Sequence, residues 1–232
     1  MIIGISQPTF IPWYGYFGLI EYVDEFIFLD HVQFDRRSWQ QRNYIKIKNE
    51  KKLLTIPTIK ENRDSQKILD VKIDHNSNFT SKFIKTIQHS YNKSKFYNDY
   101  SKKIFDIFLK KEKNLLKLNV ELINYFCEIL NIKTKMSFSS NLNIFTKKQE
   151  LIKDICKLKR CTKYVSTAGA KNYLNIDEFM KAGIELKFFH LNDFKYSQLG
   201  TKFIPKLSIM DLVFNEGPKS SEYIKANFSF EK

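Results

Sequence analysis

The feature that most constrains this chain is the segment Gln7–Phe17, QPTFIPWYGYF, together with the apolar runs that flank it. Ile2–Ile5 precedes the segment and has the length of a buried strand. The helix-spaced residues Phe17–Val23 follow it and lead into a second strand-like run, Phe26–Leu29. Because parallel strands need a long connection, a strand, a loop, a helix and a strand in this order predict a parallel crossover unit.

The loop between the first strand and the helix has an unusual composition. Pro8 and Pro12 fix their own φ angles and push the residues before them into extended conformations. Aromatic residues such as Trp13 and Tyr16 take positions that loops usually give to small polar residues. Ligands of open parallel sheets bind outside the carboxyl ends of the strands, where this loop is expected. We therefore predict an aromatic-lined site loop; a hydrophobic plug on the sheet edge is the alternative.

A second polar and aromatic loop, residues 30–43, follows the second strand. Asp30 and His31 come directly after the strand, and a carboxylate and an imidazole can exchange protons near neutral pH. Arginines such as Arg42 suit bidentate binding of phosphate or carboxylate. A solvated charged turn could share part of this composition, but Trp39 and the repeated amides are not typical of one. The loop is therefore predicted to be functional.

The middle of the chain predicts a hairpin followed by helices. Tyr44–Lys48 and Lys52–Ile56 alternate apolar and polar residues around a short charged break, which indicates a β-hairpin. After a polar loop at residues 58–67, Ile68–Ile73 has the pattern of one more short strand. Apolar residues then recur at helical spacing through residues 77–131, which predicts two or three helices.

A second crossover unit is predicted in the carboxyl-terminal part. A helix at Gln149–Lys159 leads to a strand at Tyr164–Ser166, and a short helix at Ile176–Ala182 leads to a strand at Ile184–Phe189. The loop at residues 166–174 is rich in Ser, Thr, Gly and Ala, so it permits close backbone approach and offers amide donors. It matches neither a P-loop nor a dinucleotide-binding motif, so alone it indicates phosphate binding only weakly.

These patterns together predict an α/β fold with a mostly parallel sheet, flanking helices and a short β-hairpin. We expect a single domain over residues 1–232, with the mainly helical sub-domain 77–131 inserted between the amino- and carboxyl-terminal parts of the core. Near the end of the chain, Ser208 is placed to cap a helix that Gly217 stops.

The amino-acid composition indicates the cellular compartment and the kind of binding partner. The residues are 43% hydrophobic, enough for a real core, and the formal net charge is +14, so the surface favours anionic partners such as nucleotides or acidic proteins. The three cysteines match no zinc motif and favour a reducing compartment. We expect no signal peptide and no membrane span, hence a cytoplasmic protein, and we expect no bound metal and no DNA or RNA partner.

Five blocks of the sequence, together with the Gly183-Ile184 strand entry, resemble the WbqC-like protein family: QPTFIPWYGYF, FLDHVQFDRRSWQQRN, LTIP, KYVSTAGAKNYL and FIPKLSIMDLVFNEG. The resemblance implies a bacterial cytoplasmic protein of surface-polysaccharide gene clusters, especially those for O-antigen. It further implies an N-acyl or aminoacyl transferase, which moves a group such as glycyl from a carrier-protein thioester to the amine of a nucleotide-linked amino sugar. No bound cofactor is implied, and the phosphopantetheine of an acidic carrier protein would be a co-substrate.

The resemblance also assigns residues. The proton chemistry falls on Asp30 and His31: the family pattern favours Asp30, and the intrinsic pKa favours His31 as the base. Thr167-Ala168 departs from the Gly-Pro expected there, so the backbone of that loop is expected to differ. The substrate-binding residues implied by the resemblance are Gln7, Trp13, Tyr16, Gln33, Trp39, Arg42, Asn43, Ser166, Gly169 and Gln198. Further positions of the family pattern are Pro8, Pro12, Gly15, Phe34, Ala170, Tyr173, Pro205, Ser208, Asp211, Asn215 and Gly217.

Three functions stay open on the sequence alone. Amine attack on a thioester needs a base with a near-neutral pKa and donors for the oxyanion, which the two loops can supply. A nucleotidylyltransferase-like enzyme is an alternative, but no HxGH-type pair of histidines follows the first strand. A non-catalytic binding protein of the same pathway is the other. A structural role for Asp30, in which its carboxylate only holds the 33–43 loop, is also open.

Overall fold

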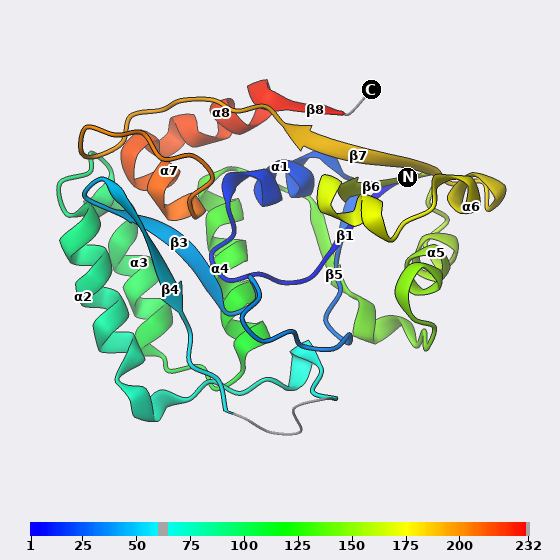
Figure 1. Ribbon diagram of the computed structural model, residues 1–232, viewed down its shortest axis with the longest axis horizontal. Helices are drawn as coiled ribbons and strands as arrows, with labels where there is room; N and C mark the ends of the chain where they lie inside the picture. Colours follow the sequence, from blue (N-terminus) through cyan, green and yellow to red (C-terminus); the bar gives the residue numbers. More distant parts are fainter. Residues whose placement is uncertain (60–64, 231–232) are drawn as a thin grey trace.

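A computed structural model describes residues 1–59 and 65–230 of the 232-residue chain. Its centre is a six-stranded sheet with the strand order β5-β2-β1-β6-β7-β8 (Figure 1). All neighbouring pairs are parallel except β7–β8. The predicted α/β class with a mostly parallel sheet is therefore confirmed. The strands are β1 (Ile2–Ser6), β2 (Glu25–Phe28), β5 (Lys135–Phe138), β6 (Lys163–Thr167), β7 (Glu185–Leu191) and β8 (Phe228–Phe230).

The first crossover unit has the predicted form. β1 pairs with β2 in parallel, with Ile5 opposite Ile27. The connecting helix α1 (Tyr14–Tyr22) begins three residues earlier than predicted, because the aromatic segment of the loop already belongs to its first turn. β1 also pairs with β6, so the chain leaves β1 toward β2 on one side and later returns on the other. The boundary between β1 and β6 is therefore the topological switch point of the sheet.

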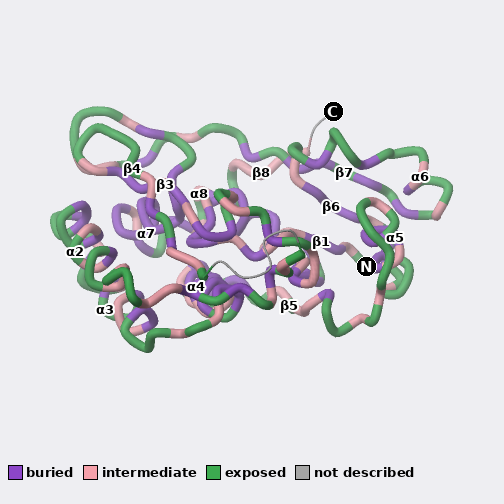
Figure 2. Tube along the Cα trace, turned by 60° about the horizontal axis from the view of Figure 1, so that its bottom comes forward, coloured by how far each residue is buried: buried purple, intermediate pink, exposed green. Residues whose placement is uncertain are grey.

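Alternation along the strands divides the core between the two faces of the sheet. Phe26 and Phe28 of β2 belong to the larger cluster, which includes buried residues of α1 and of the helices on the left in Figure 1. Ile3 and Ile5 of β1 belong to the smaller cluster, which includes buried residues of α5 (Lys148–Leu158) and α6 (Ile176–Lys181). The burial pattern of the trace in Figure 2 shows both regions of buried residues.

The predicted hairpin and helices are present. β3 (Arg42–Ile47) and β4 (Glu50–Thr55) form a two-stranded antiparallel sheet. The block predicted to be helical contains three α-helices, and two more follow β7. The division of the chain into a core and an inserted sub-domain remains a prediction. The helices are α2 (Phe79–Tyr91), α3 (Tyr97–Leu109), α4 (Leu115–Ile129), α7 (Ile209–Glu216) and α8 (Ser220–Asn227). None of the helices in the described residues is long and apolar enough to span a membrane.

The strand predicted at Ile68–Ile73 is wrong: its first residues form the 3₁₀-helix η1 (Ile68–Asp70). The backbone N–H of Ile68 donates to Val32 O, and that of Leu69 donates to Asp30 O. The start of the segment thus uses its donors to hold the loop after β2, and within the described residues Lys72 and Ile73 form only isolated bridges. Part of the predicted polar loop at 58–67, residues 60–64, lies outside the described residues.

The predicted cap of α7 is also wrong in its chemistry. Ser208 occupies the N-cap position, but its side chain makes no capping hydrogen bond, and its Oγ is buried with no partner among the described residues. The backbone of Ser208 binds other segments instead: its N–H donates to Tyr44 O, and the N–H of Ile209 donates to Pro12 O. This residue therefore ties α7 to the hairpin and to the first loop. At the other end, Gly217 stops the helix as predicted, with a φ of 56°.

Candidate functional site

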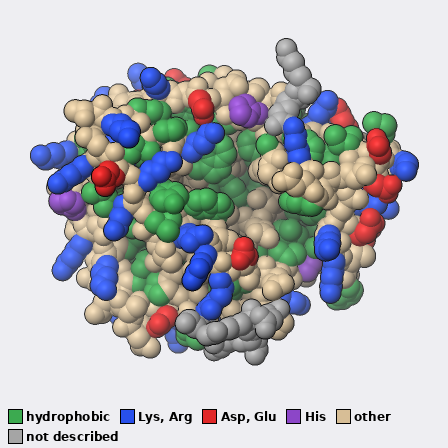
Figure 3. All heavy atoms as spheres, viewed as in Figure 1, with side chains coloured by type: hydrophobic (Ala, Val, Ile, Leu, Met, Phe, Trp, Pro, Cys, Tyr) green, Lys and Arg blue, Asp and Glu red, His purple; other side chains and the backbone are tan. Residues whose placement is uncertain are grey.

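Four parallel strands place polar side chains at the same edge of the sheet. Gln7 follows β1, and Asp30 and His31 follow β2 after Leu29. Ser139 follows β5, and Ser166 is the second-to-last residue of β6. Their register brings these positions to similar levels, because Ser6 pairs with Phe28 and Phe28 pairs with Phe138. The edge is the one at which ligands of such sheets bind. Figure 3 shows that the face carrying the loop after β1 is hollowed near its centre.

Asp30 is buried and fully engaged in hydrogen bonds. Its Oδ1 accepts from Ser139 Oγ at 3.0 Å and from the backbone N–H of Ser140 at 2.9 Å, while its Oδ2 accepts from Ser140 Oγ at 2.7 Å. These donors belong to the start of the 3₁₀-helix η3 (Ser139–Leu142), 109 residues away in the chain. Asp30 thus holds η3, whereas the structural alternative had it holding the 33–43 loop. Its side chain has the contacts of a positioning group.

His31 is positioned through the same serine. Its Nδ1 lies 2.6 Å from Ser139 Oγ. With the single hydroxyl proton of Ser139 directed to the Asp30 carboxylate, the consistent tautomer of His31 has its proton on Nδ1, which donates to Oγ. Neutral His31 then has its lone pair on Nε2, which is buried and has no hydrogen-bond partner among the described residues. The arrangement thus holds the imidazole in one tautomer, in which Nε2 is a hydrogen-bond acceptor.

Electrostatics keep that imidazole neutral. Burial is the largest influence and lowers the pKa of His31 below its usual 6.5. The Asp30 carboxylate opposes this shift, and the ammonium group of Lys67 adds to it. At neutral pH the basic form therefore predominates, as a general base requires.

Three side-chain amides form a second group beside this edge. Gln40 Nε2 donates to Gln7 Oε1 at 2.7 Å, and Asn119 Nδ2 of α4 donates to Gln40 O at 2.7 Å. Gln40 and Asn119 are almost fully buried, at 1% and 0% exposed. Even so, Gln40 Oε1 and Asn119 Oδ1 lack partners among the described residues. Buried amide oxygens without donors are costly, so this cluster of amides is a polar group held inside the core next to the strand ends.

The two loops predicted to share a site are bonded to each other. Phe10 N donates to Trp39 O at 2.8 Å. Asn43 Nδ2 donates to the carbonyl oxygens of both Phe10 and Ile11, at 3.2 and 2.9 Å. Ile11 has a φ of 35°, which is unfavourable for a β-branched residue. Asn43 therefore stabilises this turn, because its side-chain amide nitrogen binds the two backbone carbonyl groups.

The remaining predicted residues of the two loops differ in how close they are to the strand ends. Tyr16 is buried, and its hydroxyl donates to Gln7 O at 3.0 Å, so it fixes the end of β1. Trp13 packs on Tyr14, with ring centroids 5.1 Å apart, and Trp39 is 53% exposed. Arg42 begins β3 and is half-buried, and Gln33 is exposed and forms an isolated bridge with Lys67.

The predicted residues of the carboxyl-terminal part fall into two places. Ser166 lies at the strand ends, is buried, and accepts a hydrogen bond from Tyr164 OH at 3.1 Å. Gly169 is exposed in the 3₁₀-helix η4 (Ala168–Asn172), and only Thr167 Oγ1 comes within 4 Å of an added Cβ. Close backbone approach therefore does not require a glycine there. Gln198 belongs to a different network.

That second network surrounds Asp211 of α7, which is fully buried. Its Oδ1 accepts from Tyr196 OH and Gln198 Nε2, both at 2.8 Å, and its Oδ2 accepts from Tyr91 OH at 3.0 Å. The ammonium group of Lys46, itself buried, lies 3.2 Å from Gln198 Oε1. Burial raises the pKa of Asp211 to about 6, against the lowering effect of these donors and of Lys46. The network joins α2, β3, α7 and the segment after β7.

Ser139, Ser140, Gln40 and Asn119 were not among the residues predicted for the site. Gln40 lies in the loop at residues 30–43, whose repeated amide side chains could have indicated it from the sequence. The two serines follow β5, a strand that the sequence analysis did not predict, and Asn119 lies on a helical face. Among the described residues no group of three or more His, Cys, Asp or Glu side chains could hold a metal ion.

The fold and this edge define an α/β protein with polar side chains gathered at the switch point of a mostly parallel sheet. The WbqC-like protein family matches residues 7–223, and the chain belongs to that family. An uncharacterised protein of Mycobacterium tuberculosis (strain ATCC 25618 / H37Rv), Rv1507c, is 31% identical over 225 residues, which cover 96% of this chain and 97% of that protein. No solved structure matches the chain.

Proposed function

We propose that this protein is an N-acyl or aminoacyl transferase of surface-polysaccharide biosynthesis. Its donor would be an acyl or aminoacyl thioester on a carrier protein, and its acceptor would be the amine of a nucleotide-linked amino sugar. The observation that carries the proposal is the pair formed by His31 and Ser139, which leaves a neutral imidazole with a buried, unpartnered Nε2. Membership of the WbqC-like family supports the pathway.

The reaction matches what this histidine can do. The neutral amine attacks the thioester carbonyl and forms a C–N bond, and the amine nitrogen must then lose a proton. His31 Nε2 takes that proton in this scheme, since Nδ1 is already protonated and bonded to Ser139. The C–S bond of the tetrahedral intermediate breaks next, and the imidazolium returns its proton to the departing thiolate. The step conserves atoms and charge and leaves the histidine neutral.

The neighbouring groups supply the remaining roles. Asp30 acts as a positioning residue, because it fixes the Ser139 hydroxyl that sets the His31 tautomer. Gln7 has its side-chain oxygen held by Gln40, which leaves its amide nitrogen as a donor for the oxyanion. The formal charge of +14 favours both an anionic nucleotide sugar and an acidic carrier.

The direct test is intact-mass analysis of the reaction components. The protein is incubated with a carrier loaded with glycyl thioester and with a nucleotide-linked amino sugar. Transfer removes the glycyl mass from the carrier and adds the same mass to the sugar nucleotide. If the carrier stays loaded and the sugar mass is unchanged while the sugar nucleotide binds, the transferase proposal is wrong and a binding function takes its place.

His31→Gln tests the role of the base. We expect about a hundredfold lower kcat/KM, because Gln keeps polar bulk but removes the basic nitrogen. Since the folded pKa of His31 lies below 6.5, the wild-type rate should rise with pH through a value under 6.5 and then level off. The variant should lack this rise. His89→Gln, at an exposed position of α2, is the matched control and should behave as the wild type. A normal rate in His31→Gln would remove this residue from the chemistry.

A further inference from the structure

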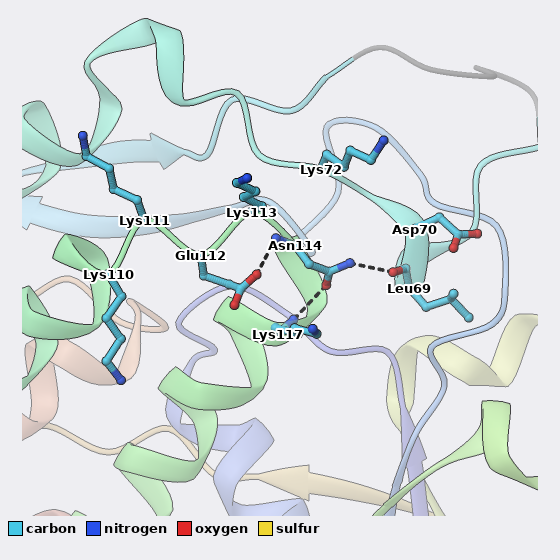
Figure 4. Close-up of a pocket in the computed structure, with 9 residues that line it drawn as sticks. All are labelled: Leu69, Asp70, Lys72, Lys110, Lys111, Glu112, Lys113, Asn114 and Lys117. Carbon is cyan, nitrogen blue, oxygen red and sulfur yellow. Dashed lines mark hydrogen bonds between the residues drawn. The ribbon is translucent and has the colours of Figure 1, made fainter.

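A pocket rich in lysine lies next to the candidate site. It has a volume of about 740 Å³ and is formed by the α3–α4 turn, the first turn of α4 and residues of the segment that contains η1 (Figure 4). Five lysines line it, against the two carboxylates of Asp70 and Glu112. This lysine pocket has taken no part in the proposed chemistry. Its lysines are Lys72, Lys110, Lys111, Lys113 and Lys117.

Three of its five lysines have no carboxylate partner among the residues that the structure describes. Lys110 is paired with Glu121 of α4. Within the described residues, the amines of Lys111, Lys113 and Lys117 have no carboxylate partner, and all three side chains are exposed. Because Glu112 Oε1 accepts from the backbone N–H of Asn114, that carboxylate is partly committed to the turn. An anionic partner is therefore attracted to the pocket.

The arrangement of the lysines distinguishes an extended partner from a single ion. Figure 4 shows Lys110 and Lys111 pointing in different directions from adjacent positions of the turn, with Lys72 on the far side of the pocket. Cations spread in this way suit several carboxylates on a surface better than one phosphate. Of the described residues that line the pocket, none is aromatic and none is an arginine, so it lacks stacking groups for bases and planar guanidinium groups for bidentate phosphate binding.

The two acidic residues also favour a protein partner. Asp70 and Glu112 would repel a uniform phosphate backbone, but they can pair with lysine or arginine side chains that interrupt an acidic protein surface. Leu69 is the only apolar side chain among the described lining residues, so insertion into a lipid bilayer has little support. We infer that the lysine pocket is the docking surface for an acidic protein, and within the proposed function, on which this rests, that protein is the thioester carrier.

Hydrogen bonds connect the pocket to the candidate site. Asn114 Nδ2 donates to Leu69 O at 2.7 Å, and Leu69 N donates to Asp30 O at 3.0 Å. Lys67, one residue before η1, is close enough to lower the pKa of His31. A carrier held at Lys111, Lys113 and Lys117 is thus bound beside the strand-end edge, where its thioester is needed.

Binding can be tested without any reaction. The probe is an acidic acyl carrier protein without its phosphopantetheine arm, labelled for fluorescence anisotropy and titrated with the full chain at low and at high salt. The combined Lys111→Glu, Lys113→Glu and Lys117→Glu variant should bind at least about tenfold more weakly, because it opposes like charges. Wild-type affinity should also fall with added salt, since exposed charges are screened.

The matched control reverses three exposed lysines of and next to α2, Lys82, Lys85 and Lys93, so it has the same net charge as the pocket variant. Equal affinity of the two variants, or binding of an RNA duplex or anionic vesicles in place of the carrier, would overturn the inference. Thermal melts confirm folding, and Lys→Gln at the three pocket positions provides a milder second variant. Transfer from a small soluble thioester tests the proposed function separately, because that donor needs no protein docking.

Discussion

Asp211 makes the stability of this protein depend on pH in the direction opposite to that of a salt-bridged carboxylate. It is 0% exposed, and burial raises its pKa from 3.8 to about 6. Between these two values the folded protein keeps a proton that the unfolded chain releases. The stabilisation is therefore complete below pH 3.8 and is lost as the pH rises through 6. A difference of about 2 pKa units corresponds to about 3 kcal/mol.

Asp211→Asn isolates this contribution, since Asn resembles the protonated carboxyl in shape and does not ionise. Urea denaturation at several pH values gives the free energy of unfolding of both proteins. The stability of the wild type relative to the variant should fall by about 2.5 kcal/mol from pH 4 to pH 7.5, because most of the titration lies in that window. The double difference cancels the titration of every other group. A difference that stays constant within about 0.5 kcal/mol would refute the reasoning.

Lys46 provides a second arm of the same experiment. Its ammonium group lowers the pKa of Asp211, and its own pKa is lowered by burial. Lys46→Met should therefore move the loss of stability to higher pH. Lys52→Met, an exposed position on the paired strand β4, is the control and should leave the pH window unchanged. If both variants give the wild-type window, Lys46 does not act on this carboxylate.

Two further outcomes follow from local geometry. Ser139→Ala removes the hydroxyl that fixes the tautomer of His31, so the transfer rate should fall about tenfold to a hundredfold while stability falls by about 1–3 kcal/mol; mass-based kinetics and urea denaturation check both, and an unchanged rate contradicts it. Gly217→Ala should destabilise more than Gly183→Ala, by at least about 1 kcal/mol. Both glycines have positive φ, but only at Gly217 would the new Cβ lie 2.6 Å from the ring of Phe96.

The order of strands along the crossovers could be predicted because each one has a local signal. Ile2–Ile5 and Phe26–Leu29 are short apolar runs on either side of a helical period, and the structure makes them neighbouring parallel strands. Ile68–Ile73 has a similar apolar pattern yet forms η1. Its donors are taken by Asp30 and Val32, which are close only after the chain has folded. A local pattern cannot distinguish these two outcomes.

The sequence predicts which site residues lie close together where each of them follows a strand of the sheet. Gln7, Asp30 and Ser166 reach one edge because parallel strands align their carboxyl ends. Gln198 was not separable from them by sequence, since it also stands in a polar segment after a strand. The structure joins it to Asp211 and Lys46 in a buried network. Its part in binding substrate remains a prediction, and its part in packing is visible in its hydrogen bonds.

The choice between Asp30 and His31 illustrates what tertiary contacts add. On the sequence alone, adjacent residues of an extended segment point to opposite faces, so only one of the two is expected to reach a substrate. The family pattern favours Asp30 for that role, and the intrinsic pKa favours His31. Ser139, 109 residues away, resolves the two roles by accepting from the imidazole and donating to the carboxylate. Because donors occupy the carboxylate oxygens while no described residue binds Nε2, we propose that His31 transfers the proton and that Asp30 positions it. A smaller loss of rate in Asp30→Asn than in His31→Gln, with only the second abolishing the rise with pH, is the result that this division requires.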